Sequence, residues 1–339
     1  MTDDAAETGA PSAGDSQPPV CLQTMWRTCG TYFYSKFKRQ PKFCAYLEPC
    51  SEFLMRSSPD DLQARFPHLR HHLRNADFGS TAGEFPFAAA GAAQYFRKRF
   101  SYEPYYMAPD IVDAELTRYV SCLFDHARRQ GRIPVAKFCR WGLRTAWLIR
   151  TFRPVIVYVA RDPDTMFRSY WSFGGRNSYF VFALLMIVGK NREEVLFQET
   201  ADVLDIPRIH GDTVREEMAQ AWRAAQRCDV QTLRDVLLIL WAVTLKHNAA
   251  MSTLLIDSDL LADNDVYRRR VEEQFTALIG EPTSFGDFES RRQPAAPGVA
   301  LSARGAALAR RALGQVLPDC GWSNVACGAA SARILSALI

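Results

Sequence analysis

Short apolar runs alternate with longer amphipathic stretches along most of the chain. Five of these runs have the length and the β-branched or aromatic content of buried strands. The predicted strands cover residues 20–26, 43–47, 134–139, 155–160 and 254–256. Other stretches repeat apolar residues every three or four positions, which predicts helices. The predicted helices cover residues 32–38, 112–130, 143–151, 212–227, 231–250, 264–279 and 301–316. Because strands that alternate with helices pair in parallel through right-handed crossovers, we predict a three-layer α/β fold with a central, mostly parallel sheet.

Two parts of the chain lack this pattern. Residues 1–20 contain four acidic residues, no Lys or Arg and few apolar side chains, which is typical of a disordered tail. Residues 51–112 mix His, Arg, Gly and aromatic residues without steady periodicity, which predicts short helices and loops. We therefore expect one α/β domain over residues 21–339, with mainly helical or loop insertions at 57–112 and 175–250.

The charge of the chain is small but unevenly distributed. The net charge is +4, and since the acidic tail carries −4, the remaining residues carry +8. This excess is too dilute for nucleic-acid binding. Within residues 21–47, however, five Lys and Arg residues occur without any Asp or Glu. The sequence therefore favours a small anionic ligand over a nucleic acid.

The cysteines and the apolar segments indicate a reducing, aqueous compartment. The nine cysteines contain no C-x-x-C pair and no metal-ligand spacing with histidine, so neither a disulfide framework nor a metal site is expected. The N-terminus lacks the features of a signal peptide. The most apolar run, Tyr179–Val188, is shorter than the about 20 residues that span a bilayer. We expect a cytoplasmic protein without membrane partners.

The loop at residues 27–31 joins the first predicted strand to the first helix. In such a loop the backbone amides and the positive end of the helix dipole converge, which favours a phosphate or sulfate group. Arg27 adds a charge, and Thr28 and Thr31 add hydroxyl donors. The G-x-x-x-x-G-K-[ST] motif of nucleoside triphosphatases is absent, which disfavours triphosphate hydrolysis. The alternative is a plain strand-to-helix turn.

A second candidate loop follows the strand at 155–160. Arg161 comes at its carboxyl end, where open α/β sheets bind ligands. Asp162 or Asp164 can cap the next helix, and Ser169 lies two turns along it. Arg161 can bind a phosphate with its guanidinium, and the Ser169 hydroxyl can assist. The alternative is a capped helix with a surface arginine.

In this order, the two loops resemble the sulfotransferases that use 3′-phosphoadenosine 5′-phosphosulfate (PAPS). The first loop of that family reads P-R-S-G-[ST]-T and wraps the 5′-phosphosulfate, and its second binds the 3′-phosphate through Arg and a Ser eight residues later. Arg161 and Ser169 have that offset. The resemblance implies a P-loop-type fold, PAPS as sulfuryl donor and 3′-phosphoadenosine 5′-phosphate as product. The cofactor contacts that it implies in the first loop are Arg27, Thr28, Cys29, Gly30, Thr31 and Tyr32.

The resemblance runs in order through most of the chain, but two departures stand out. Its weaker pieces are Glu48-Pro49, Lys137-Phe138 and Cys320-Gly321-Trp322. In the first loop, Trp26 replaces the usual Pro and the glycine is displaced by one position. The K-x-x-x-G-x-x-G-x-W-K signature of the animal cytosolic branch is missing. The C-terminal side of the cofactor site therefore stays unassigned, with Arg291 and Arg292 as candidates or as solvated surface residues.

Sulfuryl transfer requires neutralised oxygens, a positioned acceptor and a base, and it does not require Mg²⁺. Arg27 would neutralise negative charge on the bridging and non-bridging oxygens of the transferred group. Glu48, after the second predicted strand, is the first candidate for the base, because an apolar setting would raise its pKa toward neutrality. Its alternative is an ion pair with a nearby Arg or Lys, and Glu52 is the second candidate. Lys137 and Arg140 would contact the sulfuryl group or the acceptor, or form an ion pair.

The six histidines of the chain are weaker candidates for the base. His68, His71 and His72 lie in the polar insertion, and His126 is expected to be a half-buried structural residue. The acceptor pocket would be built from the two insertions and from aromatic residues that either line it or fill the core. These aromatic residues are Trp171, Phe173, Tyr179 and Phe180.

The sequence thus predicts a metal-independent sulfotransferase acting on a hydroxyl or amine of a small molecule, such as a secondary metabolite, sugar or lipid. A monomer or homodimer is expected. The alternatives are a P-loop nucleotide kinase and a non-catalytic P-loop protein that binds adenine nucleotides.

Overall fold

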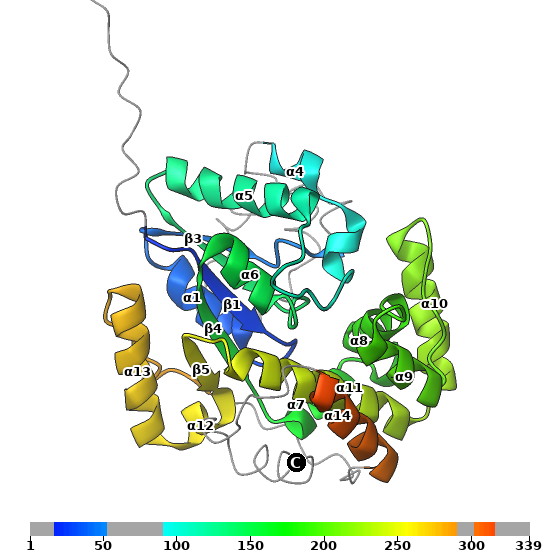
Figure 1. Cartoon of the computed structure of the whole chain (residues 1–339). Helices are drawn as coiled ribbons and strands as arrows, with labels where there is room; N and C mark the ends of the chain where they lie inside the picture. Colours follow the sequence, from blue (N-terminus) through cyan, green and yellow to red (C-terminus); the bar gives the residue numbers. More distant parts are fainter. Residues whose placement is uncertain (1–16, 53–90, 290–301, 316–339) are drawn as a thin grey trace, which may run out of the picture.

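Five parallel strands form the centre of the computed structural model, which describes residues 17–52, 91–289 and 302–315 (Figure 1). Their order across the sheet is β2-β3-β1-β4-β5, so β1 lies in the middle. The strands are β1 (Val20–Thr24), β2 (Phe43–Leu47), β3 (Ile133–Phe138), β4 (Val155–Ala160) and β5 (Leu254–Asp257). This arrangement confirms the predicted α/β class with a parallel central sheet.

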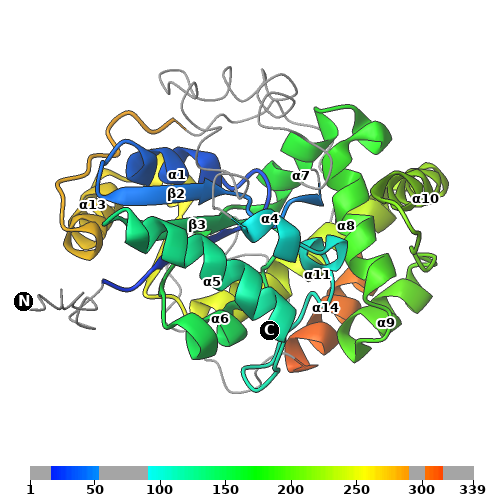
Figure 2. The same ribbon diagram turned by 90° about the horizontal axis from the view of Figure 1, so that it is seen from above.

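The strands are buried on both faces because helices cover both. Side chains of β1 alternate between the two layers, with Leu22 in one and Cys21 in the other. The Leu22 layer is closed by α1 (Gly30–Lys38), α12 (Ser258–Asp263) and α13 (Asp265–Ile279). The Cys21 layer is closed by α5 (Ala114–Arg129) and α6 (Thr145–Phe152). Figure 2 shows α1 and α5 on opposite sides of the sheet.

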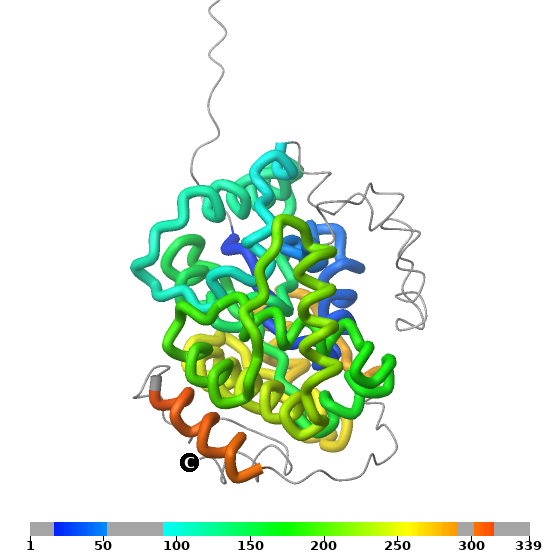
Figure 3. Tube along the Cα trace, turned by 90° about the vertical axis from the view of Figure 1, so that its right-hand side faces the viewer, coloured from blue at the N-terminus to red at the C-terminus, as the bar shows by residue number. Residues whose placement is uncertain are grey.

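A helical lobe extends from the β4 side of the sheet. Two of its helices, α8 and α11, are buried along most of their length, so they form the centre of its core. Helix α14 packs along α11 and is the orange segment in Figure 3. The lobe consists of α7 (Pro163–Trp171), η4 (Gly175–Asn177), α8 (Tyr179–Lys190), α9 (Val195–Val203), α10 (Val214–Arg227), α11 (Val230–Ala249) and α14 (Ala303–Gln315).

Most predicted element boundaries lie within two residues of the observed ones. The first strand ends at Thr24, and α1 already begins at Gly30. The predicted tail is too long by two residues, because Val20 belongs to β1 and the Pro19 carbonyl accepts a hydrogen bond from the Val155 amide at 2.8 Å. The short helix α12 has no counterpart in the prediction, and α8 and α9 fall within the insertion predicted at 175–250 without ranges of their own. In the first insertion, α4 (Ala92–Tyr95) and the 3₁₀ helix η3 (Lys98–Ser101) are the short helices expected there.

The contact between α14 and α11 leads to a prediction about stability. A Cβ on Gly305 would lie 2.5 Å from Cγ of the buried Asp235, whose carboxylate accepts hydrogen bonds from Ser302 and Gln231. We expect Gly305→Ala to lower the free energy of unfolding by about 1–3 kcal/mol, as overpacked cores do. Urea unfolding of the variant and the wild type measures this difference in the free energy of unfolding. Gly314→Ala on the same helix is the control, since nothing lies within 4 Å of its added Cβ. Equal stability of the two variants would contradict this packing.

Candidate functional site

The sheet topology places two loops side by side at its carboxyl edge. After β1 the chain crosses to β2 on one side of β1, and after β4 it continues to β5 on the other side. The connections therefore diverge between β1 and β4. Such a switch point opens a crevice at the carboxyl ends of the strands, where open α/β sheets bind ligands. The loop after β1 begins at Met25, and the loop after β4 begins at Arg161.

The loop after β1 has an unusual backbone. Arg27 and Cys29 both have left-handed backbone angles, with φ of 65° and 66°, and Thr28 lies between them. Such conformations cost about 1–3 kcal/mol each and concentrate at ligand sites. Backbone of alternating handedness turns successive N–H groups toward one point, an arrangement that binds anions.

The next residue, Gly30, allows the loop to lie close to the sheet. A Cβ at this position would lie 2.6 Å from Cγ2 of Thr24 and 3.0 Å from Cε of Lys137. Only glycine leaves room for the helix to begin here. Helix α1 has no side-chain cap, so the first-turn amides of Gly30 and Thr31 have no acceptor within the helix. The loop, the start of the helix and the Lys137 side chain therefore lie close together.

Two side chains predicted to bind the cofactor are used differently. The Thr28 hydroxyl donates to the Met25 carbonyl at 2.9 Å inside the loop, so it is not the outward donor that we predicted. The Tyr32 hydroxyl donates to Asp287 at 2.5 Å, and its ring packs against Phe288. Both side chains fix the loop and the start of α1. Only the backbone groups of these two residues therefore remain to contact a ligand.

The two motifs meet in space, as the sequence predicts. Nε of Arg27 donates to Oγ of Ser169 at 2.7 Å, and Nη1 of Arg161 donates to the Arg27 carbonyl at 2.9 Å. Arg161 and Ser169 are almost fully buried. Nε of Arg161 also lies 3.5 Å from the carboxylate of Asp259. Two guanidinium groups and one hydroxyl therefore converge at the crevice from segments more than 130 residues apart.

Aromatic side chains fix the position of the Arg27 guanidinium. The central carbon of this guanidinium, Cζ, lies 4.4 Å from the ring centre of Phe173 and 5.6 Å from that of Phe180. Both distances allow cation–π attraction. Phe173 is 44% exposed, and Trp171, Tyr179 and Phe180 are half-buried against the core of the lobe. These four aromatic residues thus lie at the border between the core and the crevice.

Helix α7, which carries Ser169, begins as predicted. Oδ1 of Asp162 accepts a hydrogen bond from the Thr165 amide at 2.8 Å, and Pro163 occupies the first turn. Asp162, and not Asp164, is therefore the cap, while Asp164 pairs with Arg234. The cap sets the direction of α7 directly after Arg161, and this direction brings Ser169 back to the Arg27 side chain.

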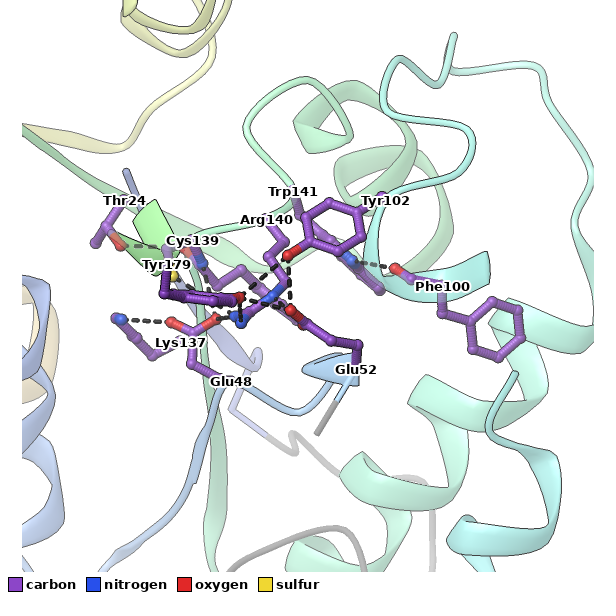
Figure 4. A network of polar contacts seen from close by, with 11 residues as sticks. Thr24, Glu48, Glu52, Phe100, Tyr102, Lys137, Cys139, Arg140, Trp141 and Tyr179 are labelled. Atoms are coloured by element: carbon purple, nitrogen blue, oxygen red, sulfur yellow. Dashed lines mark hydrogen bonds and ion pairs between the residues drawn. The ribbon is translucent and has the colours of Figure 1, made fainter. Parts of the chain in front are cut away.

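Glu48 lies between two cations next to this crevice (Figure 4). One carboxylate oxygen pairs with Nζ of Lys137, and the other lies 2.8 Å from Nη1 of Arg140. Burial alone would raise the pKa of Glu48, but the charges of Lys137 and Arg140 outweigh it and lower the pKa below 4.5. The predicted pKa near neutrality is therefore wrong, and the alternative of an ion pair is correct.

The same network continues from Arg140 to Glu52 and to two tyrosines, and no sequence pattern groups these tyrosines with Glu48. Nε of Arg140 lies 2.8 Å from Glu52, and its Nη2 donates to the Tyr179 hydroxyl at 2.6 Å. The hydroxyls of Tyr102 and Tyr179 both donate to Oε1 of Glu52, at 2.8 and 2.6 Å. Burial raises the pKa of both tyrosines well above 10. Because each polar atom has partners, the network holds Arg140 and Glu52 rigidly.

The remaining candidates lie elsewhere. His126 is half-buried on α5, where its ring contacts Gln130, as expected for a structural residue. His68, His71, His72, Arg291 and Arg292 lie outside the described residues. Within the described ranges, no three His, Cys, Asp or Glu side chains are grouped so that they could hold a metal ion. The seven cysteines of these ranges are free, and no helix there is long and apolar enough to cross a membrane.

Comparisons with known proteins identify no relative of this chain. No model of a protein family, no curated protein and no solved structure matches the chain.

Proposed function

We propose that the chain is a PAPS-dependent sulfotransferase that acts on a hydroxyl or amine of a small-molecule acceptor. One observation carries this proposal: the Arg27 loop and the Arg161–Ser169 motif, far apart in the sequence, meet at the switch point of a parallel sheet. Two guanidinium groups beside backbone amides that have no acceptor within the helix suit a nucleotide with separate anionic groups.

The residues present fit such a nucleotide. Gly30 leaves a cradle that a Cβ would fill, and the amides of Gly30 and Thr31 have no acceptor in the helix. These groups and Arg27 would hold the 5′-phosphosulfate, while Arg161 and Ser169 would hold the 3′-phosphate. When bound, PAPS supplies a sulfuryl group that moves in line to the acceptor.

Lys137 and Glu48 would act next to the transferred group. Cε of Lys137 lies 3.0 Å from the position that a Cβ on Gly30 would occupy, so the Lys137 ammonium would lie near the 5′ end and neutralise charge there. The Glu48 carboxylate holds this ammonium in place. Glu48 would accept the proton of the acceptor hydroxyl or amine. Its carboxylate is ionised at neutral pH, but its lowered pKa makes it a weak base.

A labelled donor tests the proposal. We expect the purified protein to bind 3′-phosphoadenosine 5′-phosphate in a calorimeter and to transfer ³⁵S from PAPS to a component of an acceptor mixture of sugars, lipids and phenols, without added metal. Binding of ATP with Mg²⁺ and phosphate transfer in place of sulfate would indicate a nucleotide kinase. Binding without any transfer would favour a non-catalytic nucleotide-binding protein, and absence of binding would refute the cofactor.

A further inference from the structure

A second basic site lies on the helical lobe. The loop before α10 and the outer face of α10 enclose a shallow cleft of about 340 Å³, within the about 300–1,000 Å³ typical of ligand sites. No acidic residue lines it. The lining residues are Pro207, Arg208, Gln220, Trp222, Arg223, Gln226 and Arg227. In Figure 1, α10 lies at the outer edge of the lobe, away from the strand ends.

The charges of this cleft are not balanced within α10. Arg223 and Arg227 are four residues apart and exposed on one face of the helix, where like charges repel. The two acids of α10 are used in its first turn: Glu216 forms the capping box, and Glu217 pairs with Lys98 and Lys190. Within the described part of the chain, Arg223 and Arg227 form no ion pair. Arg208 pairs with the highly exposed Glu193 and can exchange this partner for a ligand.

The cleft also contains a flat aromatic surface that is held in place. Trp222 is 46% exposed, and its indole N–H donates to Oδ1 of Asn177 at 3.0 Å, so the ring orientation is fixed. The Gln226 amide donates to the same oxygen at 3.0 Å. On the other wall, the Ile209 amide donates to the Gly189 carbonyl of α8 at 3.0 Å, which anchors the loop that carries Arg208.

We propose that this cleft binds an anionic oligosaccharide. The exposed face of Trp222 offers stacking area to the apolar face of a sugar ring. Three guanidinium groups around the ring suit sulfate or carboxylate substituents through two-pronged hydrogen bonds. The cleft shares no residue with the crevice between β1 and β4, so ligand binding here is independent of the proposed sulfotransferase activity.

Calorimetric titration with a heparin-derived tetrasaccharide tests the proposal on the full chain. We expect saturable binding that weakens at least tenfold in the Arg223→Ala/Arg227→Ala variant and at least tenfold in Trp222→Ala. Trp222→Phe, which keeps an aromatic face, should lose less than Trp222→Ala. The chemically desulfated tetrasaccharide, which keeps its carboxylates, should bind more weakly than the sulfated one but still more tightly than an uncharged maltotetraose.

The matched control is Arg215→Ala/Arg270→Ala, which removes two exposed arginines, one from the start of α10 and one from α13. It should bind the tetrasaccharide as the wild type does. If both double variants lose affinity equally, the ligand is held by general charge and the site is refuted. Absence of binding to the wild type refutes it as well. Tight binding of inositol hexakisphosphate without binding of the tetrasaccharide would overturn the assignment to oligosaccharides. Circular dichroism spectra confirm that every variant is folded.

Discussion

Arg161→Ala is expected to weaken the binding of 3′-phosphoadenosine 5′-phosphate about a hundredfold, since two lost charge-assisted hydrogen bonds amount to about 3 kcal/mol. The proposed partner of Arg161 is the 3′-phosphate. Adenosine 5′-phosphate lacks this group, so the variant should bind it only a few-fold more weakly. That smaller loss reflects the second contact of Arg161, the hydrogen bond to the Arg27 carbonyl, which supports the strained loop. Calorimetry with both ligands measures the difference.

Two further variants sharpen this test. Arg161→Lys keeps the charge but not the two-pronged geometry, so its loss should fall between those of the wild type and Arg161→Ala. Arg150→Ala removes an exposed arginine from α6 and should bind both nucleotides like the wild type. Equal losses for the two nucleotides in Arg161→Ala would show that Arg161 supports the loop without contacting a 3′-phosphate.

Glu48→Gln is expected to destabilise the folded protein by about 3 kcal/mol at pH 7, because it removes the carboxylate partner of the buried Lys137, while Arg140 keeps its pair with Glu52. Lys137 and Arg140 would both lose a carboxylate partner. The pKa of Glu48 is lower in the folded state than its ordinary 4.5, so its stabilising effect is present above that pH. It is lost as the pH falls through the lowered pKa. The stability difference between wild type and variant should therefore be constant from pH 8 to pH 5 and shrink below pH 4.5.

Turnover provides the second measurement on this variant. Because its pKa is lowered, Glu48 stays ionised between pH 5 and pH 8. Protonation of Glu48 should therefore cause no fall in the wild-type turnover rate toward acidic pH in this range, and Glu48→Gln should abolish no such fall. Glu273→Gln, an exposed substitution on α13, is the control and should change neither stability nor turnover. A wild-type acid limb near pH 6.5 that disappears in Glu48→Gln would contradict the ion pair and restore the expectation of a near-neutral base.

The fold was predictable because its signals are local. Each strand is a short apolar run, and α5 repeats its apolar residues at helical spacing, so β4 and α5 could be placed within two residues. Helix α8 is apolar along most of its length and lacks this spacing, so its range was not predicted. The meeting of Arg27 with Arg161 was also predictable, because both follow strands of a parallel sheet. The strand order itself has no such local signal, since it depends on which apolar edges pair.

The details of the site depend on contacts that no local pattern encodes. The pKa of Glu48 is set by Lys137 and Arg140, which lie 89 and 92 residues away along the chain. A threonine at position 28 is equally compatible with a hydroxyl that faces a ligand and with one that faces the Met25 carbonyl. Only the backbone angles of the loop decide between these two orientations. Tyr102 lies in a segment without periodicity, so its partnership with Glu52 had no sequence signal.

The central position of β1 determines the order in which the sheet can be completed during synthesis. Val20 pairs with Val135 in β3 and with Val155 in β4, so both neighbours of β1 are translated more than a hundred residues after it. At about 5–20 residues per second, this delay is on the order of ten seconds. Throughout this time both edges of an apolar strand are unpaired and open to other nascent chains. The nascent protein therefore depends on early shielding of its N-terminal strand. Strand β1 has both of its neighbours only when β4 has left the ribosome, and β5 completes the edge of the sheet later still.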